Sequence, residues 1–132
     1  MDDVILAKRS TIERCMQRIA EDYGDDFETN LTRQDAVLLN LERACQAAID
    51  LGAWVVAKHR LGNPTSSREI FLLLHQADWI DDELTVSLVG MVGFRNIAVH
   101  DYARLNLDIV RHIIQHRLKD LDAFSRLVLE RS

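Results

Sequence analysis

The chain contains few residues that end helices or form turns, with one Pro and five Gly among its 132 residues. A β-sandwich or barrel needs such residues between nearly all of its strands, so this scarcity argues against an all-β fold. Long apolar runs are absent as well. The longest uncharged apolar stretch, Leu84 to Phe94, is far shorter than the roughly 20 residues that cross a bilayer. We therefore expect no membrane contact.

Cysteine is also scarce, and both Cys15 and Cys45 lie inside helical patterns. Free thiols in such positions usually pack as small apolar groups. The sequence does not begin with a cationic segment followed by an apolar block and a cleavage site, so nothing suggests secretion. We expect two reduced, structural cysteines in a cytoplasmic protein.

The formal net charge of −5 argues against a general nucleic-acid binder with a broad basic surface. The charge is uneven, since residues 1–30 carry four basic and eight acidic side chains, whereas residues 101–132 carry six basic and five acidic ones. Local basic groups could therefore still bind RNA. The alternative is that the charge only keeps the protein soluble.

The residues that are plentiful, Leu, Ala, Ile, Arg, Glu and Asp, favour helix. Apolar residues recur at helical spacing in five segments. Gly62 and Pro64 mark the loop before the third segment, and Ser66 followed by Glu69 is typical of a helix start. We predict one domain over residues 1–132, an antiparallel all-α bundle of about five helices. The expected segments are 2–23, 32–59, 66–77, 82 to about 100, and 105–129.

Two of these segments show signs of close helix packing. Small and branched apolar residues in the second alternate by three and four, which indicates a narrow seam against a partner helix. Those residues are Leu38, Leu41, Cys45, Ala48, Gly52 and Val55. In the fourth, Gly90 and Gly93 each cost about 1 kcal/mol relative to Ala in a helix. The simplest explanation is the close approach of another helix.

Residues 95–102, Arg-Asn-Ile-Ala-Val-His-Asp-Tyr, carry the groups best suited to chemistry. Arg95 offers a planar fork of donors to a phosphate, and His100 can move a proton near neutral pH. Together they could cleave a phosphodiester without a metal. The alternatives are a surface Arg95 paired with Asp101 or another acid, and a His100 favoured by the helix dipole.

The spacing of these two residues poses a geometric problem. Each residue of a helix turns by about 100°, so His100 lies about 140° round from Arg95, whereas Tyr102 lies only about 20° from it. A straight helix therefore does not aim Arg95 and His100 at one phosphate. Either the helix ends near His100, or a second subunit supplies the complementary pair across a two-fold axis.

The pattern Arg95-Asn96-x₃-His100-x-Tyr102 resembles the signature of HEPN domains, in the Arg-x₄-His-x-Tyr form of the HepT-like toxins. The resemblance extends over about residues 35–105 in the expected order. The similar segments are Asp35 to Asp50, Pro64 to Phe71, and Met91 to Asn96.

The resemblance implies a homodimeric, metal-independent endoribonuclease toxin without a cofactor, acting on messenger or transfer RNA. It places paired Arg95 and His100 from both subunits in one cleft, with Asn96 and Arg104 in support. It also implies a minimal nucleotidyltransferase (MNT) as antitoxin, which transfers AMP onto Tyr102. A bulky anion there would exclude RNA by size and by charge. The alternative for Tyr102 is a half-buried phenol at the dimer interface.

Other candidates carry less chemistry. His112 and His116 are four residues apart but lack further metal ligands, so we expect surface histidines or an extension, with Arg104 and Arg111, of a phosphate-binding strip. Trp54 and Trp79 are expected in the core or an interface rather than as base-stacking platforms. Two rival functions remain: a non-catalytic module that binds or regulates a nucleotidyltransferase, and a nucleotide-sensing bundle that uses Arg95.

Overall fold

The computed structural model describes residues 2–100 and 106–132, without the side chains of residues 99 and 100. Within these ranges every regular element is a helix, so the predicted all-α fold is confirmed. No helix there combines the length and apolar character that a membrane crossing requires. The helices are α1 (Asp3–Asp22), α2 (Leu31–Lys58), α3 (Ser67–Gln76), α4 (Asp82–His100), α5 (Leu107–His112) and α6 (Leu118–Arg131), with a π-helical turn, Ile113–Arg117, between the last two.

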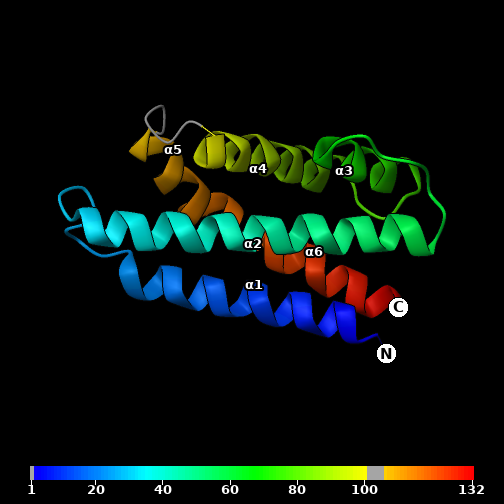
Figure 1. Ribbon diagram of the computed structural model, residues 1–132, viewed down its shortest axis with the longest axis horizontal. Helices are drawn as coiled ribbons and strands as arrows, with labels where there is room; N and C mark the ends of the chain where they lie inside the picture. Colours follow the sequence, from blue (N-terminus) through cyan, green and yellow to red (C-terminus); the bar gives the residue numbers. More distant parts are fainter. Residues whose placement is uncertain (1, 101–105) are drawn as a thin grey trace.

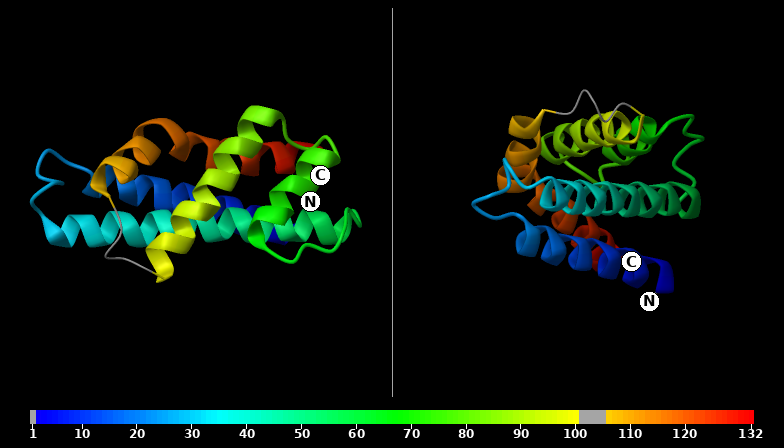
Figure 2. Two further views of the ribbon diagram at one scale, coloured as in Figure 1. Left: turned by 90° about the horizontal axis from the view of Figure 1, so that it is seen from above. Right: turned by 60° about the vertical axis from the view of Figure 1, so that its left-hand side comes forward.

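The long helix α2 lies at the centre of the molecule. It runs antiparallel to α1 on one side, and α3 and α4 cover its opposite side (Figure 1). The helix α6 packs against both α1 and α2. Figure 2 shows that α5 and α6 lie on one side of α2, while α4 crosses α2 obliquely and ends on the other side. The helix α2 is thus the common support for the rest of the fold.

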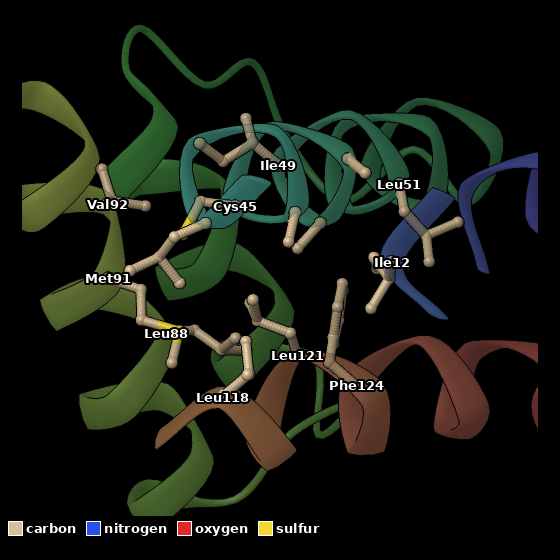
Figure 3. Close-up of a cluster of buried hydrophobic side chains, with 14 of the residues drawn as sticks. Ile12, Cys45, Ile49, Leu51, Leu88, Met91, Val92, Leu118, Leu121 and Phe124 are labelled. Carbon is tan, nitrogen blue, oxygen red and sulfur yellow. The ribbon is translucent and has the colours of Figure 1, made fainter. Parts of the chain in front are cut away.

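The seam predicted on α2 is confirmed, because all six of its residues are buried. Around it, side chains from the other helices form the core, including Ile12 of α1, Leu88 of α4 and Phe124 of α6 (Figure 3). Each fully buried side chain of this size contributes about 1.5–3 kcal/mol. At Gly52 a Cβ would lie 2.8 Å from Ile70 Cγ2. Glycine is therefore needed there for α3 to approach α2.

Polar side chains fix where several helices begin. The Asn30 side chain accepts a hydrogen bond from the Arg33 amide at 3.1 Å, so α2 begins one or two residues earlier than predicted. Ser66 accepts from the Glu69 amide at 3.2 Å, as predicted. The Glu69 carboxylate also accepts from the backbone amide and hydroxyl of Thr65. Such caps are typically worth about 1 kcal/mol each.

The predicted last helix, residues 105–129, differs from the structure, since α5 begins at Leu107 and a π-helical turn precedes α6. The wider turn has a physical reason. The buried residues Ile113 and Leu118 are five apart, a spacing that fits a π-turn and not an α-helix. Without the extra residue, Arg117 would take the place of Leu118 on the core side.

Candidate active site

Arg95 lies in the last two turns of α4, the end that crosses α2 (Figure 2). Its guanidinium is only partly buried, and Nη1 donates to Asn96 Oδ1 at 3.3 Å. Its Nε is buried and has no hydrogen-bond partner among the described residues. None of the ion pairs in the described ranges involves Arg95. No acid among the described residues therefore neutralises this cation, and Asp101 lies outside them.

Below Arg95 lies the core of the bundle. Burial raises the pKa of the Cys45 thiol to about 12, and the positive charge of Arg95 is the largest influence that opposes this shift. Farther along α4, Ala98 is buried beside the Leu38 and Glu42 positions of α2, around a small pocket of about 220 Å³. The end of α4 is therefore anchored on α2.

The other predicted site residues are not placed. The His100 side chain, Tyr102 and Arg104 lie outside the described residues, so their roles stay predictions. The bounds of α4 include both Arg95 and His100. At about 100° per residue the two positions project about 140° apart, so one helix does not direct both at the same phosphate.

An apolar groove of about 470 Å³ runs between α4 and the segment that contains α5 and the π-turn. Val86, Gly90, Gly93 and Ile97 line it from α4, and Ile109 and Ile113 line it from the other side. A Cβ at Gly90 or Gly93 would meet nothing within 4 Å. The predicted close approach to these glycines is therefore not provided by the described part of this chain. Val86 and Ile109 are 69% and 52% exposed, so the groove is left uncovered.

The remaining candidates have structural explanations. His112 and His116 are exposed with ring centroids 5.0 Å apart, and no group of three or more potential ligands among the described residues could hold a metal ion. Arg111 pairs with Glu28 and with Asp108, so it does not extend a phosphate-binding strip as a free cation. Trp79 is buried, and Arg131 stacks on its ring at 3.9 Å; Trp54 is partly buried.

Known proteins resemble this chain along almost its whole length. The family model described as "Ribonuclease HepT-like" matches residues 9–128. The mRNA nuclease HepT of Shewanella oneidensis is 49% identical over 126 residues, which cover 94% of this chain and 95% of that protein. These matches confirm the resemblance inferred from the sequence.

Two solved structures show a similar fold. One is the tri-AMPylated HEPN toxin of Shewanella oneidensis in complex with an MNT antitoxin, with a TM-score of 0.94 and 47% identity over 98% of this chain and 99% of that one. The other is a toxin–antitoxin complex with AMP-PNP, with a TM-score of 0.94 and 46% identity over the same shares.

The position of Cys45 under Arg95 predicts a specific pH dependence of stability. The pKa of the Cys45 thiol in the folded protein is raised above its ordinary value of 9.0. The contribution of this thiol to folding stability is therefore fully present below pH 9 and is lost as the pH rises toward 12. Between pH 9 and 12 the free energy of unfolding of the parent should therefore fall with rising pH. Its slope should be steeper than that of Cys45→Ala by about 1.4 kcal/mol per pH unit. Urea unfolding of both proteins at pH 8 to 11 measures this difference. The other titrating groups are the same in both proteins, so their effects cancel. A difference that does not change with pH would contradict the burial of this thiol.

Proposed function

Because this chain belongs to the HepT-like ribonuclease family, we propose that it is a cytoplasmic, metal-independent endoribonuclease toxin that acts as a homodimer and is neutralised by an MNT-type antitoxin. The observation that carries the proposal is the state of Arg95. Its Nε is buried without a hydrogen-bond partner among the described residues, and such an atom costs stability on the order of 1–3 kcal/mol. Such a cost is expected where a cation is kept for an anionic ligand.

The proposed reaction uses groups of the chain alone. His100 of one subunit takes the proton of a ribose 2′-hydroxyl, whose oxygen attacks the adjacent phosphorus. The bond from phosphorus to the 5′-oxygen breaks, and the same His100, which now carries the proton, gives a proton to that oxygen, while the second subunit supplies Arg95. Arg95 stabilises the charge that develops on the phosphorane. The products are a 2′,3′-cyclic phosphate and a 5′-hydroxyl. In this scheme Asn96 orients Arg95, and Arg104 binds a neighbouring phosphate.

The uncovered face of α4 supports the homodimer. Val86, Gly90, Gly93 and Ile97 follow one another by three or four residues and form one stripe. Two such stripes could pack closely, because glycines let the backbones of two helices approach. A two-fold axis through this face would pack the α4 helices of two subunits against each other.

The first prediction concerns the reaction. The purified parent should cleave single-stranded RNA in EDTA and leave 2′,3′-cyclic phosphate ends. His100→Ala should lower the rate by about 10²–10⁴-fold, since it removes the proton-transfer group. Arg95→Ala should lower the rate by about 10²–10³-fold, since it removes the charge stabilisation. Gel analysis of the products measures both effects, with near-UV circular dichroism as the test of folding.

His59→Ala is the matched control for this experiment, because it removes an exposed histidine at the far end of α2. It should cut like the parent. Full cleavage by both site variants would rule out the proposed chemistry. If the parent does not cut RNA but does bind a nucleotidyltransferase, the rival reading as a non-catalytic module becomes the better one.

The second prediction concerns the dimer. A Cβ at Gly93 meets nothing within 4 Å in the described chain, so Gly93→Leu should stabilise α4 by up to about 1 kcal/mol. The same side chain would prevent close packing of two α4 helices, so it should yield monomers and abolish cleavage. Sedimentation velocity measures the mass, and Ala123→Leu, at an exposed site on α6, is the control. A dimer of unchanged stability in Gly93→Leu would place the interface elsewhere.

The third prediction concerns the antitoxin. The Tyr102 phenol oxygen would attack the α-phosphorus of ATP, releasing pyrophosphate and the phenolic proton. The parent coexpressed with a cognate nucleotidyltransferase should therefore gain the mass of an AMP group, and Tyr102→Phe should not. Intact mass spectrometry measures this. Neutralised toxicity without any adduct would show that inhibition occurs by binding alone.

A further inference from the structure

A second groove, of about 330 Å³, runs between α1 and α2, and its lining is polar and basic. It lies on the edge of α1 that faces away from α6, because the neighbouring Arg9 points to α6 and donates to Ser125 at 3.1 Å. The cations that line it are Lys8, Arg14 and Arg18 from α1 and Arg43 from α2. The proposed reaction uses none of them.

Among the described residues, an ion pair balances one of the four positive charges of this groove. Lys8 pairs with Asp50 at 3.0 Å, and the Asp50 carboxylate also accepts from Gln46. Arg14, Arg18 and Arg43 form no ion pair with any acid in the described part of the chain.

The three arginines also repel one another. Arg14 and Arg18 are one turn apart on α1, an arrangement of like charges that destabilises a helix by a few tenths of a kcal/mol. All three arginines lie close enough to Cys15 to oppose the rise in its pKa that burial causes. Three cations therefore converge on one small groove, where positive potential is concentrated. An anion bound there would relieve their repulsion.

The groove lies close to Arg95, on the other side of a short stretch of α2. Arg43 and Gln46 face the groove, whereas Cys45, between them in sequence, is buried under Arg95. The two sites are thus separated by about the diameter of one helix, roughly 10–12 Å. The end of α4 also emerges on the side of α2 opposite α5 and α6 (Figure 2). A single nucleic-acid strand could therefore reach both sites.

We propose that the α1–α2 groove binds the phosphate backbone of the RNA substrate, a few nucleotides away from the bond that is cleaved. This inference rests on the proposed function. Guanidinium groups bind phosphates with paired donors and do not read the bases. Among the described residues no aromatic side chain lines the groove, so bases would not stack on it. The groove would therefore add affinity and set the minimum length of a good substrate without selecting its sequence.

The test combines Arg14→Gln, Arg18→Gln and Arg43→Gln in a His100→Ala background, so that binding is measured without cleavage. The probe is a labelled uridine oligonucleotide of about 16 nucleotides, long enough to span both sites. Each phosphate contact contributes about 0.7 to the slope of log K against log salt concentration. Loss of three contacts should reduce that slope by about 2 and weaken binding at least tenfold in low salt.

A control variant removes the same number of charges elsewhere. Lys58→Gln, Arg60→Gln and Arg68→Gln lie in the region from the end of α2 to the start of α3, and all three side chains are exposed. This variant should bind the probe like His100→Ala alone. With His100 restored, the groove variant should have a higher KM for the long oligonucleotide and an unchanged kcat. With an oligonucleotide of about four nucleotides, it should match the parent.

Equal salt slopes for the groove and control variants would overturn the proposal. So would a groove variant that binds RNA normally but no longer captures the nucleotidyltransferase, since the groove would then be a protein-binding surface. Failure of the proposed function would look different, because the parent would then not cut RNA. The slopes of log K against log salt concentration in the His100→Ala background would still decide whether the groove binds phosphates.

Discussion

The packing of α2 against helices on several of its sides is the constraint on which the rest of this structure depends. A helix buried to this degree needs small residues where its neighbours come close, and Gly52 meets this need opposite Ile70. The same packing anchors the end of α4 through Ala98 and holds Arg95 above Cys45. It also leaves one edge of α2 free to form a groove with α1. The position of each candidate site thus follows from one central helix.

Two features of the folded chain lower its stability without serving the fold itself. Arg95 keeps a buried nitrogen without a partner in the described ranges, and α4 keeps two glycines where nothing in those ranges approaches them. Alanines would stabilise the helix, and an apolar side chain would avoid the unsatisfied donor. Both costs become intelligible when a second subunit covers the glycines and an RNA phosphate faces the guanidinium.

The sequence was sufficient to predict what depends on local periodicity. The buried seam of α2 follows from residue spacing, and the start of α3 follows from Ser66, because both are decided within a few turns of one helix. The π-turn could not be predicted, since it is required only when Ile113 and Leu118 must face the same core. The basic groove was missed because Arg14 and Arg43 become neighbours only through the pairing of α1 with α2. The family signature located Arg95, but only the structure shows that no described acid forms an ion pair with it.

The central claim is that one cleft uses residues from two copies of the chain, and a mixed dimer tests it most directly. Arg95→Ala and His100→Ala proteins should each be inactive alone. After subunit exchange, the mixed dimer would hold one intact Arg95 and one intact His100 on different subunits. The account predicts that RNA cleavage appears on mixing, in proportion to the mixed dimer measured by native mass spectrometry. Abundant mixed dimer without any cleavage would contradict a cleft shared between subunits.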